Sequence, residues 1–89
     1  MNIEIEKNEE GNFRVIVHEG NSQSSHTVTL EPDYYEKLTG GRVSAEELVH
    51  KSFEFLLERE PKESILSRFD LTVIARYFPE YEREIKKRL

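Results

Sequence analysis

Two of the three histidines could combine to bind a metal ion. His18 ends one predicted strand and His26 begins the next, so the two side chains could lie close together across a hairpin. With a nearby carboxylate such as Glu19, two imidazoles form a plausible ligand set for a metal. The structural alternative is that both histidines are half-exposed strand-end residues without a ligand. His50, the third histidine, is expected at the boundary of an apolar helix face.

No catalytic motif accompanies these histidines. The sequence has no HExxH spacing and no serine in a GxSxG nucleophile turn. Ser22, Ser24 and Ser25 lie in or beside a predicted turn, where serine forms local hydrogen bonds. We therefore predict a non-catalytic protein without cofactor, and we keep a small enzyme or metal binder as a third hypothesis.

The segment from Gly40 to Ser44 combines glycines, Arg42 and the start of a predicted helix, a set of groups that can hold an anion. Glu46 and Glu47 already place negative charge in the first turn of that helix. The pattern is better explained as the glycine end of one helix followed by the N-cap of the next.

The composition indicates one folded domain, residues 1–89. Hydrophobic residues make up 36% and charged residues 35%, the net charge is −5, and there is no cysteine. Disulfide frameworks and cysteine-ligated metals are thereby excluded, and no apolar run is long enough for a membrane span. The first residues lack the pattern of a signal peptide, so we expect a soluble, cytoplasmic protein. The negative charge argues against nucleic acid as a partner.

Residues 1–30 are predicted to form a three-stranded antiparallel meander. Apolar and polar residues alternate around Ile3 and Ile5, from Phe13 to Val17, and from Ser25 to Leu30, with polar turns between them. Such a sheet needs a covering layer. Its buried face is expected to hold Ile3, Ile5, Phe13, Val15, Val17, Val28 and Leu30.

Residues 31–89 are predicted to supply that layer as three to four helices packed on one face, which makes the fold class α+β. One helix runs from Pro32 to about Leu38, and a second begins after Ser44 as N-cap and runs to about Arg59. A short helical turn is expected at residues 65–66, a helix over 71–77 with Asp70 as N-cap, and a final helix to Leu89.

The second helix has a wide apolar face, about 200° of arc at 100° per residue. This width indicates either that the helix is central to the core, or that one flank meets another element or another subunit. Phe53, Phe55 and Leu57 on this helix are therefore candidates for a surface that binds a partner protein or a second copy. Tyr77 and Tyr81, which lie close together around Pro79, are further candidates because an exposed aromatic patch would be a binding surface.

Residues 26–58 resemble a ribbon-helix-helix DNA-binding unit. The segment from His26 to Pro32 looks like the strand of that family, residues 33–38 resemble its first helix, and Gly41 followed by Ser44, Leu48, Val49 and Phe53 resembles its turn and second helix. The resemblance implies a dimer that pairs its strands between chains and places the ribbon in the major groove. Ser25, Thr27 and Thr29 would then face the bases, and Ser44 would lie at a phosphate.

The leading functional hypothesis from the sequence is a non-catalytic α+β domain that acts by protein–protein interaction and could form a homodimer. A ribbon-helix-helix-like regulator or antitoxin is the alternative.

Overall fold

The sheet has four strands and a mixed topology. A computed structural model describes residues 1–89, and in it β1 (Asn2–Lys7), β2 (Phe13–Glu19) and β3 (Ser22–Thr29) form the predicted antiparallel meander. A fourth strand, β4 (Arg68–Asp70), pairs with β3 in parallel, which gives the order β1-β2-β3-β4. The α+β class is confirmed, whereas the prediction of a sheet with only three antiparallel strands is corrected by β4.

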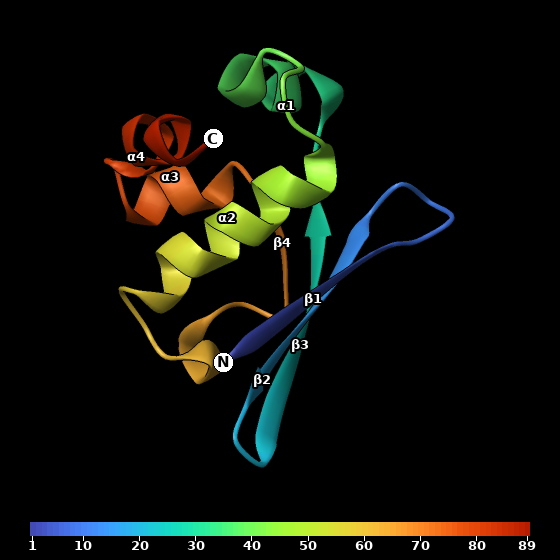
Figure 1. The fold of residues 1–89 in the computed structure, drawn as a ribbon, viewed down its shortest axis with the longest axis vertical. Helices are drawn as coiled ribbons and strands as arrows, with labels where there is room; N and C mark the ends of the chain where they lie inside the picture. The colour runs from blue at the N-terminus through green and yellow to red at the C-terminus, as the bar shows by residue number, and fades with distance from the viewer.

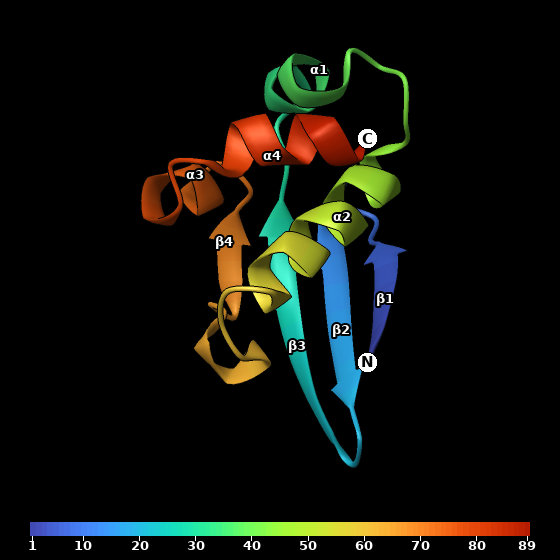
Figure 2. The same ribbon diagram turned by 60° about the vertical axis from the view of Figure 1, so that its left-hand side comes forward.

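The helices lie on one side of the sheet (Figures 1 and 2). They are α1 (Pro32–Thr39), α2 (Ala45–Leu57), the 3₁₀ turn η1 (Lys62–Ser64), α3 (Val73–Tyr77) and α4 (Tyr81–Arg88). In Figure 2, α2 crosses the front of the sheet and α4 lies next to it. None of these helices combines the length and the apolar character that crossing a membrane would require.

The segment between α2 and α3 differs most from the prediction. The short helical turn lies at η1 instead of residues 65–66, and residues 68–70 form β4. The helix expected from Leu71 begins at Val73. Asp70 is not its N-cap, because the N-cap of α3 is Thr72 and no side chain caps the helix. The Asp70 carboxylate accepts the backbone N–H of Thr72 at 3.1 Å, ahead of the first helical residue. Pairing with β3 extends this segment, and single-sequence periodicity does not register such a long-range contact.

The turn between β2 and β3 is tighter than predicted, so β3 begins at Ser22 instead of Ser25. Gly20 and Asn21 form a two-residue turn, and Gly20 has a φ of +60°. Glycine at the first turn position with a positive φ is typical of a type II′ hairpin, whose twist matches the flanking strands. The pairing consequently continues to Glu19 and Ser22.

The wide apolar arc of α2 is explained by packing on two sides of the helix. On the sheet side, the Phe53 ring lies 6.0 Å from the ring of Phe69 in β4. On the other side, the Phe55 ring lies 5.3 Å from Tyr81 and 5.9 Å from Phe78. Of the alternatives that the sequence left open, the structure thus shows a central helix whose second flank meets α4 of the same chain.

Side chains on the inner face of the sheet and on α2 form one hydrophobic core. The predicted sheet residues Phe13, Val15, Val17 and Val28 are fully buried, whereas Ile3, Ile5 and Leu30 are partly buried at its margin. The rest of the core comes from residues 31–89, that is, from the helices, from β4 and from the segments beside them. Its members are Tyr34, Leu38, Leu48, Val49, Phe53, Phe55, Leu56, Ile65, Phe69, Leu71, Ile74, Tyr81 and Ile85.

The end of α1 and the start of α2 follow the sequence signals, whereas α2 ends at Leu57 instead of Arg59. Gly40 ends α1 with a φ of +63°, a left-handed conformation that glycine adopts without steric cost. The Ser44 hydroxyl accepts the backbone N–H of Glu47 at 3.0 Å, which is the hydrogen bond of an N-cap. The interpretation of residues 40–44 as the C-cap of one helix followed by the N-cap of the next is therefore confirmed.

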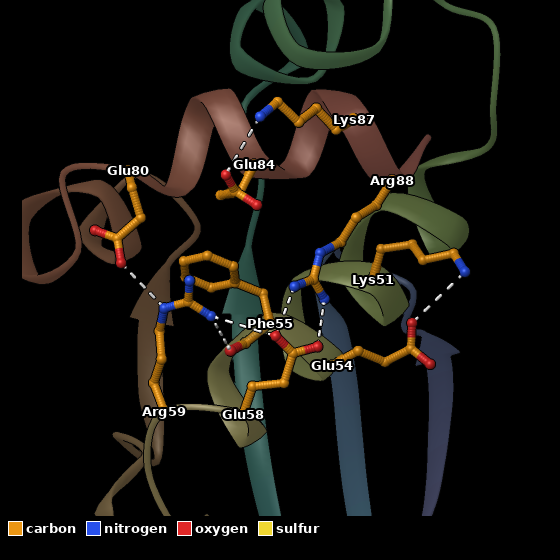
Figure 3. A network of polar contacts seen from close by, with 9 residues as sticks. All are labelled: Lys51, Glu54, Phe55, Glu58, Arg59, Glu80, Glu84, Lys87 and Arg88. Carbon is orange, nitrogen blue, oxygen red and sulfur yellow. Dashed lines mark hydrogen bonds and ion pairs between the residues drawn. The ribbon is translucent and has the colours of Figure 1, made fainter.

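Polar contacts join α4 to α2 from the surface inward (Figure 3). Arg88 forms a bidentate pair with the Glu58 carboxylate at 2.6 and 2.8 Å. Arg59 donates to Glu80 at 3.1 Å, and its guanidinium lies 3.6 Å from the centre of the Phe55 ring. Arg59, Glu80 and Arg88 are half-buried, and together with the exposed Glu58 they cover the apolar contact between the two helices.

Beneath this network, Ser52 and Tyr81 form a buried hydroxyl pair. Their oxygens are 2.6 Å apart, and the Ser52 hydroxyl also contacts the Leu48 carbonyl at 2.7 Å. Because that carbonyl only accepts, Ser52 donates to it and Tyr81 donates to Ser52. Both side chains are fully buried, so the Tyr81 hydroxyl depends on Ser52 as its partner.

Removing Ser52 is expected to destabilise the protein more than removing the Tyr81 hydroxyl. Ser52→Ala leaves that hydroxyl buried without an acceptor, at a cost of about 1–3 kcal/mol, whereas Tyr81→Phe leaves the Ser52–Leu48 bond intact. The double variant should be less destabilised than the sum of the single variants. Urea unfolding of the three variants measures these free energies, and additive effects would contradict the proposed hydrogen-bond chain.

Candidate protein-binding groove

An apolar groove lies between β4, η1, α3 and the end of α2. Its volume is about 360 Å³, and eight of its ten lining residues are hydrophobic. The lining consists of Leu56, Glu60, Ser64, Ile65, Leu66, Phe69, Val73, Ile74, Tyr77 and Phe78. Its floor is continuous with the core, since Ile65, Phe69 and Ile74 are core residues.

Two large apolar side chains at the groove are exposed. Tyr77 is 67% exposed and Leu66 is 48% exposed. Apart from Met1, no other large hydrophobic residue of the chain is exposed. Exposed apolar surface concentrated at one concave site, instead of scattered singly, is typical of a binding surface.

His26 fixes the η1 side of the groove. Its ring is buried, with Nδ1 2.8 Å from the carbonyl oxygen of Leu66 and Nε2 2.8 Å from the Ser24 hydroxyl. Since the carbonyl only accepts, Nδ1 carries the proton and donates it to Leu66. This bond connects β3 to the chain entering β4, and the imidazole also packs on Phe53, with 5.4 Å between ring centres.

The same geometry separates the three residues of the predicted metal site. His26 points to the helix-covered face of the sheet, whereas His18 lies on the opposite face, where its Nε2 is 2.5 Å from a carboxylate oxygen of Glu4. Glu19 instead contacts the ammonium of Lys62 at 3.7 Å. No group of three or more possible metal ligands is found in the chain.

Asp70 fixes the α3 side of the groove. Its carboxylate accepts the Thr29 hydroxyl at 2.6 Å, the Thr72 hydroxyl at 2.6 Å and the Thr72 backbone N–H. Partial burial alone would raise the pKa of the Asp70 carboxyl, but these hydrogen bonds outweigh it and hold the pKa below its usual value. The ionised carboxylate thus holds β3, β4 and the start of α3 together.

Lys62 fixes the base of the groove near the β2–β3 hairpin. This lysine of η1 is 3% exposed, and its ammonium contacts the carboxylates of Glu63 and Glu19. Both carboxylates are themselves exposed. The ammonium group of the buried Lys62 thus has two charged partners that lie at the protein surface. The aliphatic part of Lys62 is covered, and η1 is held against the hairpin.

The structure separates the five residues predicted as a partner surface. Phe53, Phe55 and Tyr81 have no exposed area. They are core residues rather than surface, because the sheet and α4 cover the two flanks of α2. Leu57 is partly buried against the core, and Tyr77 is exposed at the groove. Of this set, Tyr77 alone lies at the candidate site.

The residues assigned to DNA under the ribbon-helix-helix resemblance also have structural contacts. Within the chain, β3 pairs with β2 on one edge and, over Thr27–Thr29, with β4 on the other. The strand pairing between chains that the resemblance implies is therefore not the pairing observed. The Thr29 hydroxyl donates to Asp70, and Ser44 caps α2. Ser25 and Thr27 lie on the open face of the sheet.

A second, polar depression of about 440 Å³ lies between the α1–α2 loop and the end of α4. Lys37, Arg42 and Lys86 line it together with Glu36. Lys37 is already paired with Glu82 at 3.2 Å. The loop at Gly40, considered above as an anion site, lines this depression. The charged side chains there are exposed and of both signs, so they do not form an enclosed anion site.

Sequence reasoning did not identify most of the groove. The sequence predicts a helical turn at residues 65–66 and places Phe69 just before a helix N-cap, so it does not predict β4. Val73 does lie in a helix, as predicted, but nothing in the sequence indicates that it lines a groove. The available signal was the alternation of polar and apolar residues from Arg68 to Thr72, which is the period of a strand.

Comparison of the chain with protein-family models, with curated proteins and with solved structures finds no match.

Asp70→Asn is expected to destabilise the protein at neutral pH by about 1.5 kcal/mol, because the charged acceptor of three hydrogen bonds is lost. The pKa of Asp70 is lower in the folded protein than in the unfolded chain, where it is about 3.9. Its stabilising effect is therefore complete above pH 4 and is lost as the pH falls through the folded pKa. The gap between wild type and variant should close in acid.

Urea unfolding between pH 7 and pH 2 measures this gap. Asp33→Asn is the matched control, since Asp33 is exposed at the start of α1. If the free energies of unfolding of the wild type and of Asp70→Asn differ by the same amount at every pH down to 2, the role assigned to the carboxylate is contradicted.

Proposed function

We propose that this protein is a non-catalytic protein-binding domain and that the groove beside β4 binds an apolar segment of a partner protein. The observation that carries the proposal is the joint exposure of Leu66 and Tyr77 at a groove lined by eight apolar residues. Interface cores are enriched in aromatic residues, and tyrosine supplies a large contact area at low entropic cost.

The fixed walls of the groove support binding in its observed form. His26 holds the Leu66 backbone, Asp70 holds the start of α3, and Lys62 holds η1 against the hairpin. A preformed site loses little conformational entropy when a partner binds, so more of the contact energy appears as affinity.

The environment of the side chains best suited to chemistry favours binding over catalysis. Ser52 and Tyr81 are buried with each other as partners, and His26 uses both ring nitrogens in hydrogen bonds to Ser24 and to a backbone carbonyl. These groups lie in the core, where they position elements of the fold.

Selection of a random-peptide phage library on the immobilised full-length chain tests the proposal. We expect enriched peptides to contain apolar residues and to shift NMR amide signals of groove residues. Leu66→Ser combined with Tyr77→Ser should weaken binding at least about tenfold, because two side chains no longer bury apolar surface against the peptide.

Ile16→Ser is the control, since Ile16 is a partly exposed apolar residue on the opposite face of the sheet. This variant should bind as wild type does. Enriched peptides that shift only signals outside the groove, or that bind equally well to the double variant, would contradict the proposal.

A further inference from the structure

The free edge of β4 forms one side of the groove. Ser67 accepts the backbone N–H of Thr27 at 2.8 Å, and Leu71 donates to the Thr29 carbonyl at 2.9 Å, so residues 67 and 71 face β3. Alternate residues of a strand direct their backbone groups to opposite sides. The N–H and C=O groups of Arg68 and Asp70 therefore point away from β3, and no strand of the chain lies beyond them.

Side chains along β4 divide between the two faces of the sheet. Phe69 points inward, packs on Phe53 and lines the groove. Arg68 and Asp70 point to the open face, as alternation requires. A strand added beside β4 would place its inward side chains next to Phe69, in the groove, and its outward side chains next to Arg68 and Asp70.

The charges along this edge favour an acidic outward side chain. Arg68 is exposed and makes no ion pair within the chain. The Asp70 carboxylate is already occupied by Thr29 and Thr72. Glu60 also lines the groove, but it follows α2 on the helix side, where the inward side chains of an added strand would lie. Opposite charges on adjacent strands stabilise pairing.

We propose that the groove and the free edge of β4 together bind an extended segment of a partner protein as a fifth strand, with apolar side chains directed inward and an acidic side chain beside Arg68. Strand addition obtains affinity from main-chain hydrogen bonds and specificity from pockets for alternate side chains. This inference rests on the proposed function and specifies the mode of binding and the chemistry of the partner.

The other free edge of the sheet, on β1, lacks this combination. Ile3 and Ile5 are partly buried against the core, and neither of the two grooves described above is lined by them. Glu4 and Glu6 place negative charge along that edge. These carboxylates would repel the acidic side chain of an added strand, because like charges on adjacent strands destabilise pairing. The β4 edge, where Arg68 makes no ion pair, is therefore the edge suited to such a strand.

The probes are capped peptides of alternating valine and glutamate, and a matched peptide with lysine in place of glutamate. We expect the glutamate peptide to bind the full-length chain at least about tenfold more tightly than the lysine peptide. Binding should slow hydrogen exchange of the Arg68 and Asp70 amides by about tenfold or more. Arg68→Glu should reverse the preference for the two peptides, whereas Arg14→Glu, on the same face two strands away, should not.

Backbone methylation separates strand addition from docking of side chains alone. Two further glutamate peptides carry N-methyl groups on alternate amides, one set in each register. We expect methylation in one register to abolish binding and methylation in the other to leave it unchanged, since an added strand turns one set of amides toward β4.

The outcomes distinguish this inference from the proposed function. Shifts of groove signals without slower exchange at Arg68 and Asp70, or equal effects of the two methylated peptides, would overturn strand addition and leave the groove as a binding site. If no glutamate peptide binds, strand addition is overturned, and the library selection then decides the proposed function separately. Slower exchange that grows with protein concentration without peptide would identify a second copy as the occupant and overturn a foreign segment.

Discussion

The fold depends on one helix that is buried on two sides. Phe53 of α2 packs on the sheet, and Phe55, two residues later, packs on α4 and the segment before it. Residues two positions apart point about 200° from each other around a helix, so both flanks of α2 must be covered. The sheet and α4 can supply that cover only if the chain reverses after α2 and returns past it, as it does through β4 and α3.

This return path also explains the groove. The chain after α2 reaches the sheet edge at η1, runs along β3 as the three-residue strand β4, and leaves again into α3. This short strand extends the sheet, but no helix covers its free edge. The groove beside β4 consequently stays open, and Leu66 and Tyr77 remain exposed there. The binding site that we propose is a consequence of how the core is closed.

The elements with strong local signals were predictable, and those that depend on long-range pairing were not. Ser44 and Gly40 mark helix ends through hydrogen bonds and backbone angles within a few residues, and alternation around Val15 specifies a strand directly. Phe69 lies in a segment that fits both periods, and only its pairing with Val28, far away in the sequence, decides for a strand. Tyr81 is likewise buried because α4 packs on α2, whereas Tyr77 of α3 is exposed at the groove, and no local pattern distinguishes the two tyrosines.

The structure shows that several of the acidic residues behind the net charge of −5 make contacts within the chain. Acidic side chains connect elements: Glu58 pairs with Arg88, and Glu82 accepts the Tyr34 hydroxyl at 2.8 Å. That hydrogen bond holds the pKa of the Glu82 carboxyl below its usual value. Charges used in this way are partly neutralised by their partners and reveal little about what the protein binds. The charge that bears on binding is local, because at the short range of strand pairing a partner meets Arg68 directly and the distant carboxylates are screened by salt.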